Sequence, residues 1–367
     1  MSGPFALEYR QGQKLERRAM NRSTNSCSTS NVHLQHQLPS PSVTDGKTSE
    51  DKNRRSETAG LRQEFLMTKA SLKVATIQFE LRQEKSLRQY LEHMESFVKR
   101  AAKQGAEVVL FPELASTGLL AAVEDHDVTT ASIASDYWHF LPHLTDDIVA
   151  GLVRMARENQ IVVAGGSHNR VAEDGSLRNT AFIVHPDGRV ESQDKIHLTP
   201  QEHALGARGG DELLVTKIGP FTAGLLICAD IQFPELTRYL VHKGVDLILC
   251  PSLTWNRRGV HRVRTGCQAR AIENQLYVVM SPLFGTNGLP TDSPMYAVGK
   301  ALVSGPVDKT VGINDGILAT TDSAEEQVLI VDLDHDLLLA SRANPEAPGL
   351  ALRRLDLYAK LQAEMGA

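Results

Sequence analysis

The sequence predicts an α/β fold in which helices cover both faces of a mainly parallel sheet. Short, continuous apolar runs at 108–111 and 245–250 have the length and composition of strands that are buried on both faces. Segments with helical periodicity lie between such runs. In residues 84–104 the apolar positions recur at three- and four-residue steps, at Leu87, Leu91, Met94 and Val98. Strands and helices that alternate along a chain are typical of an α/β domain.

In the first half of the chain, apolar runs of strand length end at turn residues or at proline. These strands are expected at 72–79, 108–111, 161–164 and 180–184. The periodic segments predict helices at 84–104 and 145–158, the second with Thr145 as its N-cap. The run Pro186-Asp-Gly188 then predicts a hairpin turn that leads to a strand beginning at Arg189.

The second half of the chain continues the same alternation. Strands are expected at 221–227, 245–250, 276–280, 296–304 and 327–333. Helices are expected at 234–242, 262–273 and 353–365. Pro234 suits the first position of its helix, because the backbone N–H that proline lacks would have no partner there.

Composition and charge limit the kinds of partner. The 367 residues are 41% hydrophobic and 23% charged, as in an ordinary globular protein. Residues 1–66 carry a net charge of +3 and the remainder a net charge of −8. An acidic main body does not favour a nucleic-acid partner. No apolar run approaches the roughly 18 residues that span a bilayer, so no membrane partner is expected.

The chain divides into three parts by composition. Residues 1–68 are rich in Ser, Thr, Asn, Gln and Arg without periodicity, and we expect a disordered extension there. Residues 69–337 are the expected main domain, and residues 338–367 a C-terminal tail. Met67 lies a few residues before the first strand, so we hypothesise that the native protein starts there, which N-terminal sequencing would test.

Cys228 stands where the apolar run 221–227 meets a turn, and Asp230 and Pro234 follow it. A strand holds the backbone rigid, and the turn after it projects the side chain out of the sheet. The N-terminus of the next helix would favour negative charge near the sulfur. Most single cysteines simply pack in a core, so a role for Cys228 as a nucleophile depends on the other residues of the chain.

Two other segments place ionisable side chains after strands. Glu113 follows the run 108–111 directly after Pro112, which ends the ladder of hydrogen bonds. It is therefore expected at the carboxyl edge of the sheet, where open α/β sheets place their sites. Lys195 also follows a strand-like segment, and Glu202 lies seven residues beyond it.

These segments together resemble the nitrilase (carbon–nitrogen hydrolase) superfamily. The resemblance extends over about residues 72 to 333 and has three motifs in the family's order. They are Phe-Pro-Glu at Glu113, Lys-x-His-Leu at Lys195 and Cys-x-Asp-x-x-Phe-Pro-Glu at Cys228. The resemblance implies a carbon–nitrogen hydrolase domain over 69–337, built as an αββα sandwich of four layers that usually forms homodimers. The tail 338–367 is a candidate for the dimer contact. It also implies a Glu113–Lys195–Cys228 triad with Glu202 as a fourth member.

The resemblance also implies a role for each residue. Cys228 would be the nucleophile and Glu113 the general base, while Lys195 and the backbone N–H of Ala229 would stabilise the oxyanion. Glu202 would orient Lys195 or bind the leaving nitrogen. Two more residues, Trp255 and Asn256, lie in a loop that we expect to face the site, and they are candidate substrate contacts.

We therefore predict a hydrolase that cleaves a non-peptide C–N bond of a small linear amide through a cysteine thioester. True nitrilases typically carry Trp-Glu after the cysteine, whereas Ala229-Asp230 here resembles the amidase side of the family. No cofactor and no metal are expected, and a thiol nucleophile indicates the reducing cytoplasm. N-acyl transfer with the same triad, nitrile hydrolysis and a non-catalytic scaffold remain alternatives.

Overall fold

The computed structural model describes residues 70–289 and 297–366, and the expected polar extension 1–68 therefore lies outside the described residues. The strands are β1 (Ser71–Leu81), β2 (Val108–Leu110), β3 (Val162–Val171), β4 (Leu177–Val184), β5 (Val190–Asp194), β6 (Val215–Ile218), β7 (Phe221–Leu225), β8 (Leu247–Leu253), β9 (Tyr277–Gly285), β10 (Leu302–Ser304), β11 (Ile317–Thr320) and β12 (Gln327–Asp334).

The helices connect these strands, as the alternation in the sequence predicts. They are α3 (Leu87–Lys103), α4 (Ile133–Phe140), α5 (Thr145–Asn159), α6 (Pro200–Ala204), α7 (Pro234–His242), α8 (Arg257–Asn274), α9 (His335–Ala343) and α10 (Leu355–Glu364). Three short 3-10 helices are η1 (Ala115–Ala122), η2 (Pro142–Leu144) and η3 (Cys228–Gln232).

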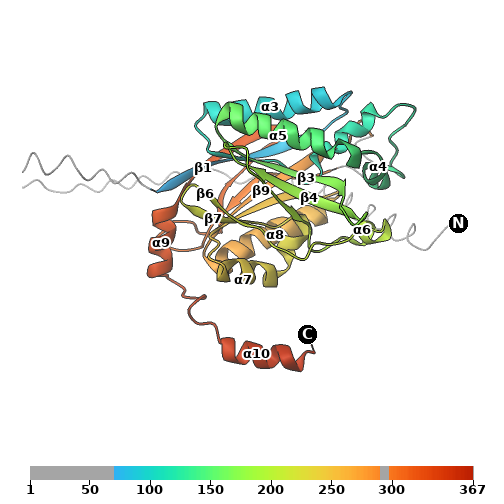
Figure 1. The fold of residues 1–367 in the computed structure, drawn as a ribbon. Helices are drawn as coiled ribbons and strands as arrows, with labels where there is room; N and C mark the ends of the chain where they lie inside the picture. The colour runs from blue at the N-terminus through green and yellow to red at the C-terminus, as the bar shows by residue number, and fades with distance from the viewer. Residues whose placement is uncertain (1–69, 290–296, 367) are drawn as a thin grey trace, which may run out of the picture. The chain divides into compact units, whose positions relative to one another are not determined.

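The strands form two halves that meet at β1. The strand order is β5-β4-β3-β2-β1-β9-β8-β7-β6, and β12 pairs antiparallel with β1. The first part of β1 pairs with β2, whereas its last residues, 79–81, pair with β9. Helices α3 and α5 lie outside one half and α7 and α8 outside the other, with the strands between them (Figure 1). The predicted α/β class is confirmed, and the layers follow the expected αββα order.

Strand β2 is apolar throughout because both of its faces are covered. The side chains of β2 and of Phe111 alternate between two hydrophobic clusters. Val108 and Leu110 belong to the cluster that also contains residues from the strands of the second half. Val109 and Phe111 belong to the cluster on the opposite face, with residues of α3 and α5 such as Met94. The side chains of β2 and of Phe111 are fully buried. A strand with two buried faces reads as the continuous apolar run that predicted it.

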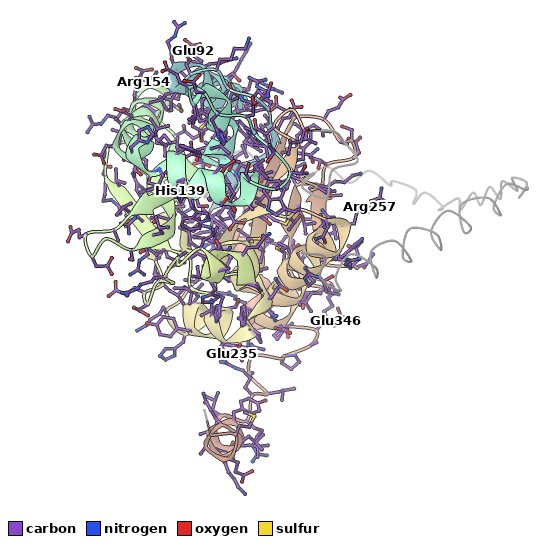
Figure 2. All side chains as sticks on the ribbon, turned by 90° about the vertical axis from the view of Figure 1, so that its right-hand side faces the viewer. Glu92, His139, Arg154, Glu235, Arg257 and Glu346 are labelled. Atoms are coloured by element: carbon purple, nitrogen blue, oxygen red, sulfur yellow. The ribbon has the colours of Figure 1, made fainter. Side chains whose placement is uncertain are left out.

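The outer faces of the helical layers are polar. Figure 2 shows Glu92 and Arg154 projecting outward from α3 and α5, and Glu235 projecting from α7. Helices α3, α5 and α7 therefore each have one face buried against the rest of the domain and one face toward solvent. No helix within residues 70–289 and 297–366 is long and apolar enough to cross a membrane.

A bulge in β3 supports the segment that carries Glu113. The pairing of β3 with β4 shifts between Ala164 and Ser167. At this shift Gly166 has a φ of +74°, and a Cβ atom there would lie 1.9 Å from the carbonyl oxygen of Pro112. The Ser167 backbone N–H donates to that same oxygen at 3.3 Å, and its Oγ accepts from the N–H of Leu114 at 3.1 Å. The bulge thus holds the backbone on both sides of Glu113.

Several elements differ from those expected. The helix predicted at 262–273 begins earlier, at Arg257, because the Asn256 side chain accepts from the N–H of Gly259 and caps it. Thr145 is not an N-cap: its hydroxyl donates to the Pro142 carbonyl, and α5 continues directly from η2. In the expected strand 296–304, residue 296 is outside the described residues, and the strand itself is Leu302–Ser304. The expected boundary at 337 falls inside α9.

The contact between Gly166 and Pro112 gives a first prediction. Gly166→Ala should lower the free energy of unfolding by about 2–4 kcal/mol, because it adds an overlap with backbone to the strain of a positive φ. Gly175 is a matched control: its φ is +76° but nothing lies within 4 Å of an added Cβ. Gly175→Ala should therefore lose only about 1 kcal/mol. Urea unfolding measures both, and equal losses would refute the role of the contact.

Candidate active site

The four ionisable residues predicted to act together do lie together. Lys195, directly after β5, donates from Nζ to Glu113 Oε1 at 2.8 Å and to Glu202 Oε2 at 2.9 Å. The fourth residue, Cys228, is connected to Glu113 through Leu253 at the end of β8. The Cys228 thiol donates to the Leu253 carbonyl at 3.3 Å, while the Leu253 N–H donates to Glu113 Oε2 at 2.9 Å. All four ionisable residues are at most 6% exposed.

Cys228 occupies a strained turn. Strand β7 ends at Leu225, and Cys228 is the first residue of η3 with a φ of +49°. A residue with a Cβ atom rarely adopts this left-handed conformation, which stores about 1–3 kcal/mol and is found mainly at functional sites. The Ser252 hydroxyl donates to the sulfur at 3.5 Å. The sulfur lies against Ser252 and the Leu253 carbonyl at the end of β8.

The positive charge of Lys195 lies between Glu113 and Glu202 and acts on the pKa of both carboxylates. Burial opposes its positive charge, but Glu113 and Glu202 outweigh burial and raise the pKa of Lys195 well above its ordinary value. Burial and the like charge of Glu202 raise the pKa of Glu113. The positive charge of Lys195 lowers it, but the net shift is upward. For Glu202, burial is outweighed by Lys195 and by hydrogen bonds, so the pKa is lowered. Glu202 is thus the counter-ion of Lys195, and Glu113 is the carboxylate that more readily takes a proton.

The hydrogen bonds of Glu202 fix its position. Its Oε2 accepts from the Thr199 N–H at 2.7 Å while its own N–H donates to Thr199 Oγ1 at 3.3 Å, which is the reciprocal capping box of α6. Its Oε1 accepts from Lys195 at 3.2 Å and from Asn179 Nδ2 at 3.0 Å. With both oxygens already bonded twice, Glu202 is arranged to orient Lys195.

Asn179 is a residue of the site that the sequence prediction missed. It lies in β4, is fully buried, and donates from Nδ2 to both Glu113 Oε1, at 2.9 Å, and Glu202 Oε1. One amide group therefore spans the two carboxylates and fixes the distance between them. In the sequence Asn179 is one of three consecutive polar residues near the start of β4, and this pattern does not distinguish a buried from an exposed position.

The expectation that a helix N-terminus favours a thiolate at Cys228 is wrong. The short η3 separates Cys228 from α7, which begins at Pro234. Burial and the nearby charge of Glu113 raise the pKa of the Cys228 thiol far above its ordinary value, and Lys195 offsets this only in part. These effects favour the neutral thiol over the thiolate at Cys228.

The residues predicted to contact the substrate are connected to the site less directly than the four central residues. Ala229 follows Cys228 and is half-buried, so its backbone N–H is beside the nucleophile. Trp255 is half-buried and packs against the cluster under α3 and α5. Asn256 is exposed, and its side-chain oxygen is used as the cap of α8. No hydrogen bond between described residues connects Trp255 or Asn256 to the four central side chains.

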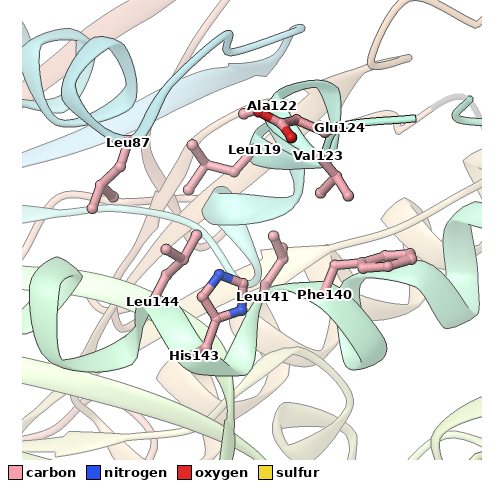
Figure 3. Close-up of a pocket in the computed structure, with 9 residues that line it drawn as sticks. All are labelled: Leu87, Leu119, Ala122, Val123, Glu124, Phe140, Leu141, His143 and Leu144. Atoms are coloured by element: carbon pink, nitrogen blue, oxygen red, sulfur yellow. The ribbon is translucent and has the colours of Figure 1, made fainter. Parts of the chain in front are cut away.

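Other hollows and cysteines lie apart from this site. Figure 3 shows an apolar cavity of about 300 Å³ that none of the four residues lines. Its lining residues are Leu87, Leu119, Ala122, Val123, Glu124, Phe140, Leu141, His143 and Leu144. Cys250 and Cys267 are fully buried in the core. Among residues 70–289 and 297–366, no group of His, Cys, Asp or Glu is arranged to hold a metal ion.

Comparisons with known proteins agree with this geometry. The family described as carbon-nitrogen hydrolase matches residues 73–342. The probable hydrolase YhcX of Bacillus subtilis is 32% identical over 289 residues, which are 78% of this chain and 54% of YhcX, so the chain spans about half the length of that relative. A nitrilase of Pyrococcus abyssi is 27% identical over 68% of this chain and 85% of its own length.

A solved structure shares the fold. It is a mutant of the amidase from Nesterenkonia sp. AN1, in which acrylamide has undergone Michael addition at the active-site cysteine. It is 24% identical, covers 74% of this chain and 97% of its own, and has a TM-score of 0.58. The family match covers most of the chain, and the motifs around Glu113, Lys195 and Cys228 fall within it. The chain therefore belongs to the carbon–nitrogen hydrolase (nitrilase) superfamily, on its amidase-like side, whose enzymes hydrolyse carbon–nitrogen bonds other than peptide bonds.

Proposed function

We propose that the protein hydrolyses a small linear amide through a thioester on Cys228. The observation that carries the proposal is the connection of Cys228 and Glu113 through the two peptide groups of Leu253. A nucleophile and a base on opposite sides of one residue, both buried and beside a fixed cation, provide what amide hydrolysis requires. A cysteine that only packs in the core would not require a carboxylate and a cation beside it.

In the first step the sulfur attacks the amide carbonyl carbon. The S–C bond forms while the thiol proton passes to Glu113, whose raised pKa suits it to accept a proton. The carbonyl oxygen becomes an oxyanion. Lys195 supplies a fixed positive charge to it, and the backbone N–H of Ala229 donates a hydrogen bond. Because Lys195 is already held by two carboxylates, it needs no reorganisation as the negative charge develops.

In the second step the C–N bond breaks. Glu113 returns its proton to the departing nitrogen, and ammonia or an amine leaves. Water then attacks the thioester and gives a proton to Glu113. As the C–S bond breaks and the carboxylic acid departs, Glu113 passes that proton to the leaving sulfur, which restores the thiol. Glu113 therefore acts as a base and then as an acid in each half of the cycle, and the neutral Cys228 thiol is both the start and the end of the cycle.

The residues after the nucleophile bear on the substrate. Ala229-Asp230 replaces the Trp-Glu pair of typical nitrilases, which favours amides over nitriles. Residues 231–233, Ile-Gln-Phe, include no cation. Members of the family that act on carboxylate-bearing substrates often place Arg in that stretch. We therefore propose a substrate without a carboxylate in the position that such an Arg would bind.

The C-terminal helix suggests a partner for the chain itself. None of the residues of α10 is buried, although it and its neighbours include apolar side chains. These are Leu352, Leu355, Leu357, Tyr358, Leu361 and Met365, all at least 40% exposed. We propose that the protein is a homodimer or a higher homo-oligomer in which this tail is covered. Sedimentation velocity of the full chain tests this proposal, and a monomer at micromolar concentration would refute it.

Removal of the nucleophile tests the reaction. Cys228→Ala should lower ammonia release from the best substrate by at least about a thousand-fold, because the thioester forms on the sulfur that this change removes. The measurement uses a panel of amides, nitriles and N-carbamoyl compounds. The control is Cys267→Ala, which removes a buried thiol from the core and should retain turnover. Full activity of Cys228→Ala would refute the mechanism.

The same panel separates the alternatives. Product that forms only when an amine is added would indicate N-acyl transfer, and turnover of nitriles alone would indicate nitrile hydrolysis. If folded protein turns over nothing and Cys228→Ala retains the biological effect, the protein is a scaffold.

Removal of the second carboxylate tests the role of Glu113. The charge of Glu202 is one cause of the raised Glu113 pKa. In Glu202→Gln the pKa of Glu113 should therefore fall, and the acidic limb of the kcat/KM profile should move to lower pH. The maximal rate should also fall about tenfold, because Lys195 loses its orienting partner. Glu235→Gln, on the surface of α7, is the control. A limb that stays in place or moves to higher pH would contradict this assignment.

A further inference from the structure

Beyond the proposed chemistry, the contacts below Cys228 assign a role to Asp230. We propose that Asp230 is a positioning residue that holds the segment carrying Lys195 against the turn carrying Cys228. The proposal rests on the proposed function, since it concerns the relative placement of the nucleophile and the cation. Asp230 lies in η3, two residues after Cys228, and is fully buried.

The carboxylate of Asp230 binds backbone from both segments. Its Oδ2 accepts from the N–H of Ile196 and from the N–H of Ile227, each at 3.3 Å. Its Oδ1 accepts from the N–H of His197 at 2.7 Å. Ile196 and His197 directly follow Lys195, and Ile227 directly precedes Cys228. One side chain therefore fixes the backbone next to both residues.

The position matters because the site is built from two halves of the fold. Glu113 and Lys195 follow β2 and β5 of one half, whereas Cys228 and Leu253 are at the ends of β7 and β8 of the other. Relative movement of the halves would change the distance between the sulfur and the ammonium group. A displacement of about 1 Å at a reacting centre can lower a rate about a hundred-fold. Asp230 restrains this movement and also holds the strained turn at Cys228.

The environment of Asp230 is built for a hydrogen-bond acceptor. Three backbone N–H groups point at its two oxygens, and His197 Nδ1 lies 3.2 Å from Oδ1. Burial raises the pKa of this carboxyl, while the backbone donors and the charge of Lys195 act in the opposite direction. The His197 ring stacks on Phe233, with centroids 3.5 Å apart and planes 7° apart, and so covers this side of the carboxylate. An asparagine would place an N–H₂ group against N–H donors and leave at least one of them buried without an acceptor.

A second buried aspartate offers a matched control. Asp246 is 6% exposed, accepts from the Thr222 N–H at 2.8 Å, and lies 2.8 Å from His335 Nε2. It precedes β8, whereas Leu253 ends it, so the length of the strand separates Asp246 from the site. Asp230→Asn and Asp246→Asn make the same chemical change to a buried carboxylate that binds backbone and histidine. Only Asp230 connects the backbone next to Lys195 with the backbone next to Cys228.

The experiment measures Cys228 without requiring a known substrate. The full-length wild type, Asp230→Asn, Asp246→Asn and Cys228→Ala are treated with acrylamide, and peptide mass spectrometry follows adduct formation at Cys228. Asp230→Asn should slow the adduct at least about tenfold, because the turn carrying Cys228 is no longer held against Lys195 and the Glu113 that Lys195 binds. Asp246→Asn should react within about twofold of the wild type. Urea unfolding of both variants controls for stability, and their losses should be comparable.

The outcomes are distinct. Unchanged or faster adduct formation in Asp230→Asn would overturn the proposal, and so would an equal slowing in Asp246→Asn. If Asp230→Asn does not fold, Asp230→Glu takes its place: it keeps the acceptors but displaces them, so the rate should again fall, and a wild-type rate would refute the proposal. Where a substrate is known, kcat should fall with little change in KM. If no amide is turned over but Asp230→Asn still slows the adduct, the positioning role stands and the proposed function fails.

Discussion

The structure of this site depends on burying the Lys195 ammonium between two carboxylates. An unpaired charge in such a place would be very unfavourable, and breaking a buried pair commonly costs about 3–5 kcal/mol. Glu113 and Glu202 therefore belong to the stability of the domain as well as to its chemistry. The two carboxylates that share this cation are not equivalent. The pKa of Glu113 is raised, chiefly by burial, whereas Lys195 and hydrogen bonds outweigh burial at Glu202 and lower its pKa, so Glu113 is the carboxylate suited to act as the proposed base.

The sequence predicts the reactive side chains of the site better than the residues that hold them in place. Glu113, Lys195 and Cys228 each follow a strand and belong to a motif, so order along the chain is sufficient to group them. Glu202 has the weakest signal of the four, and its capping box with Thr199 explains why it lies beside Lys195. Asn179 and Leu253 could not be predicted, because they act through cross-strand position and backbone atoms, which residue identity does not reveal.

The same distinction applies to the fold. Elements with strong periodicity or continuous apolar runs, such as β1, α3 and β8, are predicted to within a few residues. Helix α4 and strand β6 are missed because they are short and carry no strong pattern. The bulge at Gly166 is also invisible, although two adjacent glycines mark it, because only the contact with Pro112 shows why a side chain is excluded. Local pattern predicts elements, whereas contacts between distant segments decide how they support the site.

The strained turn and the buried, neutral sulfur have a consequence for the lifetime of the protein. Peroxide and similar oxidants react with the thiolate of cysteine far more readily than with the thiol. A nucleophile that gives up its proton only when a bound amide is attacked presents little thiolate to such oxidants between turnovers. If Glu113 takes the thiol proton as we propose, the same geometry would protect Cys228 from irreversible oxidation between turnovers.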